Sequence, residues 1–394
     1  MTEVFDISQS YDTEKILLGI AGFYPTKIRR GLLVSLVCST VVFITFTQFA
    51  SVTVYAKKQI SDVTKISEIF LFSTTQIAFV NKLINFVVKN ENTVKIDGLL
   101  SDTVLTRVNK HESRMLRNEI QKAKTAAVLY RILCASVVIS YGIFPQFDRT
   151  PGKKNYPFYG EYPFNPDNYY VAVYIVQVCV VGVSAWLNST MDLLFVKLTT
   201  LATVLFAILS ERIKNASNRR RNEDVTVDVA LRKCVVYYNT LLTFVGLIEA
   251  TFSYGIFIQF LCSAIVICLT GFQMMVINFT SAQFILLVFY FICMTCQVGM
   301  YCWYGQLVMQ KSDEITNACY HVNWNEIDIK SQKMLIIIME RAKRPSTVHA
   351  AGVFPLNLAT LMTVRAKLCE QQLKHGQFTQ HLFLNCFYIG FFLT

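Results

Sequence analysis

Six long apolar runs dominate this chain and limit what it can fold into. They lie at about 31–55, 67–88, 125–147, 169–209, 237–275 and 281–306, and a weaker seventh begins near Phe354. A helix needs about 20 mostly apolar residues to cross about 30 Å of hydrocarbon, and each of the six meets that length. Charged residues make up only 16% of the sequence, whereas about 25% is usual for a soluble protein. The pattern predicts an all-α membrane protein with a seven-transmembrane helical bundle.

The fourth and fifth runs are longer than a bilayer requires. At about 40 residues each they would form helices close to 60 Å long, about twice the thickness of the hydrocarbon. Part of each helix should therefore project into water on one side. Three charged residues inside these runs, Asp192, Lys197 and Glu249, are expected near the projecting ends, because a charge at the bilayer centre is costly.

The positively charged residues predict the orientation of the bundle. The loops at 89–124, 210–236 and 307–353 carry 21 Lys and Arg residues together, whereas the loops at 56–66, 148–168 and 276–280 carry 6. Cytoplasmic loops accumulate Lys and Arg, so the first set should lie inside the cell together with the N-terminus. Seven helices then leave the C-terminus outside. This inverted topology is the reverse of that of a G-protein-coupled receptor.

The loop at 148–168 has an unusual composition. It is rich in Pro, Gly, Asn and Tyr, which favour turns over helix. We expect this loop to form an ordered aromatic lid over the outer face of the bundle.

Motifs for enzyme chemistry are missing from the sequence. It has no glycine-rich phosphate loop, no Gly-x-Ser-x-Gly elbow and no paired-carboxylate motif. The net charge of +11 is spread over short loops, without a zinc finger or a basic arm for nucleic acid. We therefore predict that the chain is not an enzyme, binds no nucleic acid and needs no metal or cofactor. A receptor, a channel or a transporter remains, and the lack of a repeated half argues against a transporter.

Several residue clusters near the C-terminal end carry a family resemblance. In order they are Tyr301-Cys302-Trp303-Tyr304-Gly305, Ala318-x-Tyr320 with Trp324, Arg341-Ala342-Lys343-Arg344-Pro345, and Ala351-Gly352-x-Phe354-Pro355-Leu356-Asn357-Leu358. Their order and spacing resemble the C-terminal signature of the insect odorant receptors. The resemblance implies a seven-helix, N-inside, ligand-gated non-selective cation channel. In that family a ligand-specific subunit and a shared coreceptor form a hetero-tetramer around one pore.

The length of the chain favours one role within that family. At 394 residues, without the long cytoplasmic insertion of the coreceptor, it resembles a ligand-specific subunit. Its implied partners are a volatile small-molecule odorant, the coreceptor and membrane lipid, and its implied place is the plasma membrane of olfactory neuron dendrites. A gustatory receptor of the same superfamily is an alternative, against which the stretch from Arg341 to Leu358 argues. A G-protein-coupled receptor would need the opposite orientation.

The odorant pocket is expected in the outer half of the bundle. Small apolar ligands are bound mainly by burial, at about 25 cal/mol per Å² of apolar area, so the lining should be aromatic with one or two hydroxyls. The candidate ligand-binding residues are Phe70, Phe72, Ser73, Gln76, Ser140, Tyr141, Phe144, Tyr174, Val180, Trp186, Phe289 and Tyr290.

Further site residues follow from the family's architecture, in which projecting helix ends form a cytoplasmic anchor and the seventh helix lines the pore. The segment from Lys330 to Lys343 has an apolar helical face suited to the anchor, or to a helix lying on the membrane surface. Pro355 is expected in the first turn of the pore helix. The candidate anchor and pore residues are Trp303, Tyr304, Tyr320, Trp324, Phe354, Pro355 and Asn357.

Residues 1–363 form the expected seven-helix domain, and residues 364–394 depart from the family pattern. Arg365, Lys367, Glu370 and Lys374 would enter the hydrocarbon, at about 2.5–3.5 kcal/mol for each centrally placed charge. A normal seventh helix is therefore not expected. A Val-Arg pair can be encoded by a splice-donor sequence. We hypothesise that the tail from about Val364 onward translates an unspliced intron.

Overall fold

Helices make up almost all of the structure. The computed structural model describes residues 2–4, 10–24, 63–147, 155–158, 162, 164–216, 227–359 and 362. Its helices are α1 (Asp12–Ile20), α3 (Val63–Val88), α4 (Asn90–Ser101), α5 (Thr103–Thr106), α6 (Lys110–Phe147), η2 (Pro166–Tyr169), α7 (Tyr170–Ala216), α8 (Val227–Val276), α9 (Ala282–Tyr320), η3 (Trp324–Glu326) and α10 (Ile329–Ala342). Two short antiparallel strand pairs join β1 (Thr2–Val4) to β2 (Arg107–Asn109) and β3 (His349–Ala350) to β4 (Phe354–Pro355).

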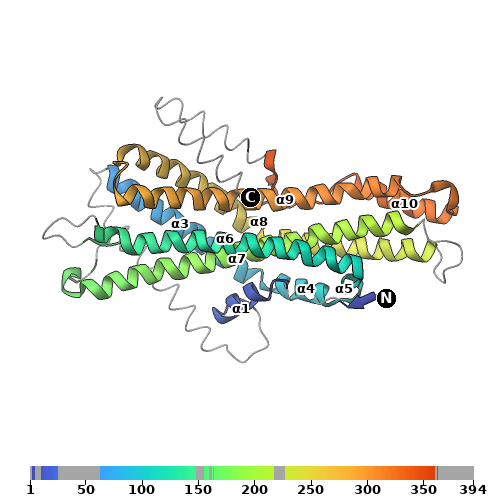
Figure 1. Ribbon diagram of the computed structural model, residues 1–394, viewed down its shortest axis with the longest axis horizontal. Helices are drawn as coiled ribbons and strands as arrows, with labels where there is room; N and C mark the ends of the chain where they lie inside the picture. The colour runs from blue at the N-terminus through green and yellow to red at the C-terminus, as the bar shows by residue number, and fades with distance from the viewer. Residues whose placement is uncertain are drawn as a thin grey trace.

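Four long helices give the molecule an elongated shape. α6, α7, α8 and α9 run along its long axis, α3 lies in one half, and α4, α5 and α10 lie in the other (Figure 1). Within the described residues, five helices are long and apolar enough to cross a membrane. They correspond in sequence to predicted spans two to six. The predicted span at 31–55, most of the helix after residue 359 and the tail at 364–394 lie outside the described residues.

Several helices extend beyond the predicted apolar runs, and α8 already begins at Val227 rather than near residue 237. α6 begins at Lys110 rather than near residue 125, and α9 continues to Tyr320 rather than ending near residue 306. The added segments are polar helices, which apolar run length does not detect. At about 1.5 Å per residue, the four long helices measure about 57 to 75 Å, so all four project beyond a bilayer. The projection predicted for α7 and α8 is thus shared by α6 and α9.

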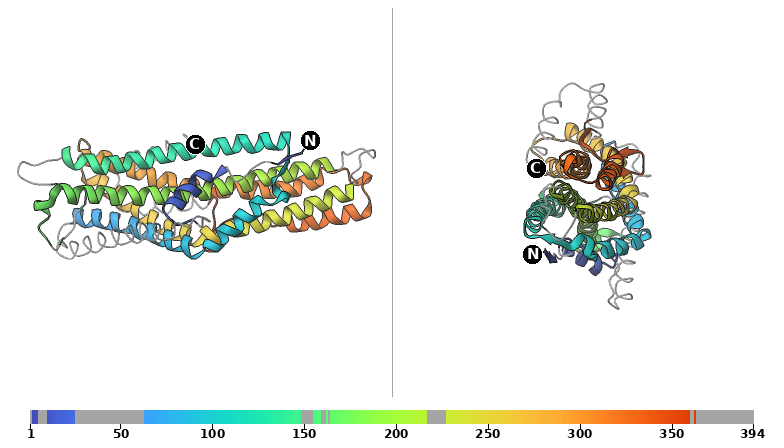
Figure 2. Two further views of the ribbon diagram at one scale, coloured as in Figure 1. Left: turned by 90° about the horizontal axis from the view of Figure 1, so that it is seen from below. Right: turned by 90° about the vertical axis from the view of Figure 1, so that its right-hand side faces the viewer.

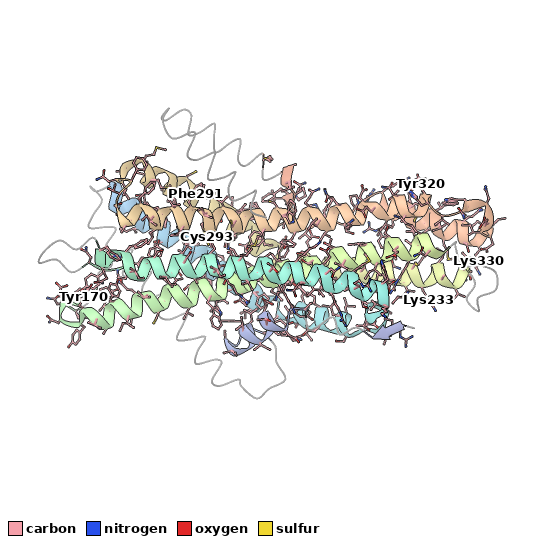
Figure 3. The ribbon with its side chains drawn as sticks, viewed as in Figure 1. Tyr170, Lys233, Phe291, Cys293, Tyr320 and Lys330 are labelled. Carbon is pink, nitrogen blue, oxygen red and sulfur yellow. The ribbon has the colours of Figure 1, made fainter. Side chains whose placement is uncertain are left out.

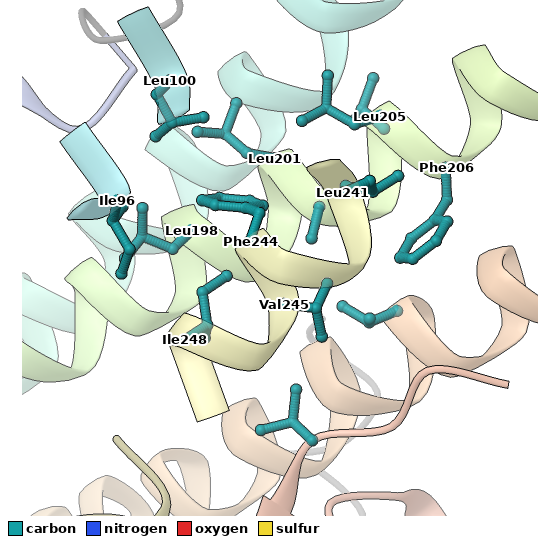
Figure 4. Close-up of a cluster of buried hydrophobic side chains, with 14 of the residues drawn as sticks. Ile96, Leu100, Leu198, Leu201, Leu205, Phe206, Leu241, Phe244, Val245 and Ile248 are labelled. Carbon is teal, nitrogen blue, oxygen red and sulfur yellow. The ribbon is translucent and has the colours of Figure 1, made fainter. Parts of the chain in front are cut away.

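The main hydrophobic core surrounds α7. Every residue from 189 to 202 is buried, so four successive turns of this helix are covered on all sides. This part of α7 therefore lies inside the protein rather than at its surface, although it includes the charged residues Asp192 and Lys197. Figure 4 shows side chains that α4, α7 and α8 contribute to this core, namely Ile96, Leu100, Leu198, Leu201, Leu205, Phe206, Leu241, Phe244, Val245 and Ile248.

The N-terminal helix α1 packs against the middle of α7 (Figure 2). Its Glu14 is fully buried and forms ion pairs with Lys197 of α7 and, at 2.8 Å, with Arg131 of α6. The expectation that Lys197 lies at a projecting helix end is therefore wrong. The charge is accommodated inside the protein because a second segment of the chain brings the opposite charge.

Two tyrosines fix the ends of this N-terminal segment. The hydroxyls of Tyr11 and Tyr24 donate to Oδ1 of Asp97 in α4 at 2.8 and 2.9 Å, and Lys15 pairs with Oδ2 at 2.7 Å. Burial raises the pKa of both phenols above the ordinary value, and the negative charge of Asp97 raises it further. Both tyrosines therefore stay neutral donors through the physiological range.

Candidate functional site

Four aromatic side chains from four segments meet at one end of the bundle. Phe158 of the predicted lid lies between Phe72 of α3 and Tyr141 of α6, with ring centroids 4.3 and 5.0 Å away. Tyr290 of α9 meets Tyr141 edge to face at 6.3 Å, and its hydroxyl shares a hydrogen bond with the hydroxyl of Thr75. We refer to Phe72, Tyr141, Phe158 and Tyr290 as the aromatic cluster.

The lid is tied to α7 through one side-chain amide. Oε1 of Gln177 accepts from the backbone N–H of Phe158 at 3.2 Å, and Nε2 donates to the carbonyl of Phe158 at 3.2 Å and to the Tyr162 hydroxyl at 2.8 Å. Tyr170, labelled at this end in Figure 3, donates from its hydroxyl to the carbonyl of Asn155 at 2.9 Å. The described part of this loop is therefore ordered over the aromatic cluster, as the sequence predicted.

A second apolar layer continues the aromatic cluster. It is formed mainly by α8 and α9, with one residue each from α3 and α6. Its buried members are Leu71, Val137, Val266, Ile267, Met274, Leu286, Leu287, Tyr290, Phe291 and Met294, and Phe291 is labelled in Figure 3. Tyr141, Phe144 and Phe289 pack against it. The lid end of the molecule is thus an enclosed apolar region shared by α3, α6, α8 and α9.

The twelve predicted ligand-binding residues divide by exposure. Phe72, Gln76, Ser140, Val180 and Tyr290 are buried, and Ser73, Tyr141, Phe144, Tyr174 and Phe289 are half-buried. Phe70 and Trp186 are 57% and 38% exposed, so their side chains lie on the outside of the bundle. Of the twelve candidates, Phe72, Tyr141, Phe144, Phe289 and Tyr290 are the ones that pack in the aromatic cluster or the apolar layer next to it.

A buried polar network lies near the middle of the molecule, beneath the apolar region. Nζ of Lys82 forms an ion pair with Oδ1 of Asp192 at 2.6 Å and donates to Oδ1 of Asn188 at 2.7 Å. Asp192 also accepts from Nε2 of Gln297 at 2.6 Å and from the Tyr301 hydroxyl. We refer to Lys82, Asn188, Asp192, Gln297 and Tyr301 as the polar core. Tyr130 of α6 donates to Oδ2 of Asp192 at 3.3 Å.

The polar core joins the membrane-spanning helices to one another. Lys82 comes from α3, Asn188 and Asp192 from α7, and Gln297 and Tyr301 from α9. Gly255 of α8 faces the stem of Lys82, since a Cβ on it would lie 3.4 Å from Cγ of Lys82, in ordinary van der Waals contact. A cavity of about 10 Å³, enough for about one water molecule, adjoins the ion pair. The expectation that Asp192 lies near a projecting helix end is therefore wrong.

Sequence reasoning missed Lys82 although a signal was available. Lys82 and Asp192 are charged residues of opposite sign inside two different apolar runs. Ionisable residues in membrane spans usually face the interior and pair with one another. That rule predicts that both side chains face the interior, but it leaves the partner of Lys82 open, because Glu249 is another acidic residue inside an apolar run.

The stretch before the seventh helix is a hairpin on α8 and α9, which corrects the prediction that Phe354 and Pro355 begin a helix. β3 and β4 pair His349 with Pro355 and Ala350 with Phe354. Ser253 of α8 donates to the carbonyl of His349 at 2.6 Å. Helical backbone begins only at Leu358, beyond Asn357. The sequence does not distinguish a proline at a helix start from a proline in an edge strand, because neither position needs a hydrogen bond from its backbone N–H.

The hairpin packs closely against α9 at Gly305, a contact that we refer to as the hairpin seat. A Cβ at Gly305 would lie 2.4 Å from the carbonyl oxygen of Leu356 and 2.7 Å from its Cβ. Glu249, also predicted near a helix end, accepts from the backbone N–H of His349 at 3.2 Å. The hairpin therefore contacts α8 through hydrogen bonds and α9 through close packing.

The predicted anchor residues lie in the half opposite the lid, where Figure 3 labels Tyr320, Lys233 and Lys330. Trp324 donates from its indole N–H to the carbonyl of Cys319 at 3.2 Å, and Tyr304 is half-buried. Trp303 and Tyr320 are 41% and 63% exposed in the single chain. α10 forms as predicted, and it packs on α8 and α9 through Leu335 and Ile338 rather than lying apart from the bundle.

These features define a class: a multi-pass α-helical membrane protein with an enclosed aromatic cluster beneath an ordered lid. A family model described as 7tm Odorant receptor matches residues 62–366, and the chain belongs to this odorant receptor family. The predicted family is confirmed, and so is the prediction that the chain is a receptor rather than an enzyme. Within the described residues no group of His, Cys, Asp and Glu is arranged to bind a metal.

Known relatives come from insects. Odorant receptor 10 of Aedes albopictus is 23% identical over 260 residues, which cover 64% of this chain and 68% of that protein. Putative odorant receptor 85d of Drosophila melanogaster is 30% identical over 196 residues, 49% of this chain and 46% of that protein. The chain thus aligns with between about half and two thirds of the length of these two relatives.

Solved structures show the same fold. The insect olfactory receptor OR5 from Machilis hrabei matches with a TM-score of 0.81 at 13% identity, over 94% of this chain and 98% of that one. The same receptor in complex with eugenol matches with a TM-score of 0.78 at 13% identity, over 98% and 99% of the two chains. The predicted seven-transmembrane helical fold is confirmed, while its inverted orientation stays a prediction.

Proposed function

We propose that this chain is the odorant-binding subunit of a ligand-gated, non-selective cation channel that it forms with a coreceptor. It would act in the plasma membrane of olfactory neuron dendrites, with its N-terminus inside the cell. Family membership and the multi-pass fold support this function. The observation that carries it is the aromatic cluster beneath the lid, because volatile ligands are bound by enclosed apolar surface with few polar groups.

The arrangement of the helices supports a route from ligand to pore. α9 contributes Tyr290 to the aromatic cluster, Gln297 and Tyr301 to the polar core, and Gly305 to the hairpin seat. The hairpin leads directly into the segment expected to line the pore. A ligand that displaces α9 at the cluster would therefore act on the hairpin through the same helix.

The proposed domain boundary places the end of family-like sequence at about residue 363. The family match ends at residue 366, which supports this boundary. We retain the proposal that residues 364–394 translate an unspliced intron. Genomic DNA with no acceptor site and no family-like exon downstream would contradict it.

The test is expression in oocytes together with an insect odorant receptor coreceptor. Odorant-evoked cation current would be recorded from the chain as it stands and from a version whose residues after Thr363 are replaced by a family-like exon. We expect current from the repaired version, and none from the coreceptor alone. If the original chain conducts equally well, the proposed account of the tail is wrong. Silence of both versions toward a broad odorant panel, despite surface expression, would contradict the receptor function.

Two phenylalanines provide a matched pair for the ligand site. Phe72 is 7% exposed and belongs to the aromatic cluster, whereas Phe70 is 57% exposed on the same helix. Phe72→Ala should raise the odorant concentration for half-maximal current, and Phe70→Ala should leave it unchanged. Equal effects of the two substitutions would place the odorant elsewhere. The same recordings address the gustatory alternative, in which tastants rather than volatile odorants would open the channel.

A further inference from the structure

Two polar side chains beneath the aromatic cluster are buried without a partner. Gln76 of α3 and Ser184 of α7 are each 5% exposed. Oε1 of Gln76 and Oγ of Ser184 have no hydrogen-bonding partner among the residues that the structure describes. Buried polar atoms in proteins are nearly always hydrogen-bonded, so two orphans in one region call for a specific explanation.

Their positions follow from the cluster above them. Phe72 packs with Phe158 of the lid, and Val181 packs against the small cluster that these two residues form with Ile69. Gln76 follows Phe72 by four residues and Ser184 follows Val181 by three, so each lies one turn further along the same helix face.

α3 and α7 run in the same direction and contact each other, since Lys82 of α3 reaches Asn188 of α7 further along both helices. Gln76 and Ser184 therefore occupy the same level, between the aromatic cluster and the polar core.

The chemistry of the two orphan atoms selects a ligand group. The carbonyl oxygen of Gln76 can only accept a hydrogen bond, whereas the hydroxyl of Ser184 can donate one. A hydroxyl on a ligand satisfies both, by donating to Gln76 and accepting from Ser184. An ester, ketone or aldehyde oxygen can accept but not donate, and a hydrocarbon does neither. The aromatic cluster directly above would contact the apolar body of such a molecule.

We propose that Gln76 and Ser184 form a polar subsite that binds the hydroxyl group of an alcohol or phenol odorant beneath the aromatic cluster. This inference rests on the proposed odorant-binding function and narrows its ligand class. Neutral hydrogen bonds of this kind, which replace bonds to water, change affinity by about 10-fold.

The experiment compares probes that differ only in the hydroxyl. The pairs are benzyl alcohol with ethylbenzene, cyclohexanol with methylcyclohexane, and hexan-1-ol with heptane, and in each pair a methyl group replaces the hydroxyl. Concentration-response curves would be recorded from the repaired full-length chain with the coreceptor. Binding would also be followed through the melting temperature of the purified receptor in detergent, which does not depend on channel opening. We expect the alcohol to be about 10-fold more potent than its partner in at least one pair.

Three variants separate the subsite from general effects on the fold. Gln76→Leu and Ser184→Ala should each remove the preference for the alcohol and leave the potency of the hydrocarbon unchanged. Ser189→Ala is the matched control, because Ser189 lies on the same helix as Ser184 and is also buried, but already donates to the carbonyl of Trp186 at 2.9 Å. It should keep the preference.

The possible failures are distinguishable. Equal potency within every pair would overturn the subsite, as would a preference for the alcohol that survives Gln76→Leu and Ser184→Ala. Activation by odorants without a hydroxyl, and by none of the alcohols, would overturn it too while leaving the receptor function intact. No current and no change in melting temperature with any odorant would instead contradict the proposed function itself.

Discussion

The ion pair between Lys82 and Asp192 should contribute strongly to the stability of the fold. Its nitrogen and oxygen are 2.6 Å apart, and the two side chains are 7% and 1% exposed. Removal of one partner leaves a buried charge without its counter-charge, which typically costs about 3–5 kcal/mol. Lys82→Met and Asp192→Leu should therefore each destabilise the receptor, and by different amounts.

The remaining hydrogen bonds determine which variant loses more. Lys82→Met leaves the carboxylate of Asp192 with donors from Tyr130, Gln297 and Tyr301, so the cost should be about 3 kcal/mol. Asp192→Leu leaves the Lys82 ammonium with Asn188 and Tyr301, two neutral partners, so the cost should reach about 5 kcal/mol. The double variant removes both charges and leaves four neutral groups unpaired. At about 1 kcal/mol each, its cost should be about 4 kcal/mol rather than the sum of about 8 kcal/mol.

The assay is the melting temperature of each detergent-solubilised variant, followed by fluorescence-detected size exclusion. The double variant should melt no lower than Asp192→Leu alone. Lys311 and Glu314 provide a control pair with the same 2.6 Å separation but side chains 36% and 46% exposed. Their joint replacement by Met and Leu should cost less than about 1 kcal/mol. Additive losses from Lys82→Met and Asp192→Leu would refute the argument, since independent effects would mean that the two charges do not depend on each other.

Two further predictions concern the hairpin seat and the N-terminal segment. Gly305→Ala should abolish odorant-evoked current at normal surface expression, because its Cβ would lie 2.4 Å from the Leu356 carbonyl oxygen. Gly299→Ala on the same helix is the control and should conduct normally, because a Cβ there would have nothing within 4 Å. Equal currents from the two variants would contradict the role of the hairpin seat. The melting temperature should fall as pH rises above about 10, where unfolded tyrosines lose protons that folded Tyr11 and Tyr24 retain because their pKa is raised. A Tyr11→Phe and Tyr24→Phe double variant should show a shallower fall between pH 9 and 11, and an unchanged slope would show that these two groups are not responsible.

The sequence predicted those parts of the fold that depend on local composition. Apolar run length identified α3 and α7 close to their observed bounds and the C-terminal end of α8, and helical periodicity identified α10. The Pro-rich and Tyr-rich loop was expected to be an ordered lid, and its residue Phe158 packs against Phe72 of α3 as an apolar side chain should. These features depend on residues that are close together in the chain. Sequence patterns report interactions over such short separations.

The parts that could not be predicted depend on contacts between distant segments. Lys110 to Lys124 is polar and resembles a loop, yet it is helical because α6 continues along α7 outside the apolar region. Lys82 and Asp192 are 110 residues apart in sequence, and only the packing of α3 on α7 brings them together. Gln76 was expected among the ligand-binding residues, whereas Ser184 was not, because its lack of a partner is visible only in three dimensions.

α8 connects the two ends of the receptor without a break. Met274 lies in the apolar layer at the lid end and Ser253 holds the hairpin, which places them about 32 Å apart on one helix at 1.5 Å per residue. No proline interrupts the sequence between them, so no proline kink is expected in this segment. A tilt of only about 5° about the midpoint of this segment would move each end by about 1.4 Å in opposite directions. Ligands that differ in width by a single methyl group could therefore produce graded displacements at the hairpin, so the size of a ligand would set the degree of opening as well as its affinity.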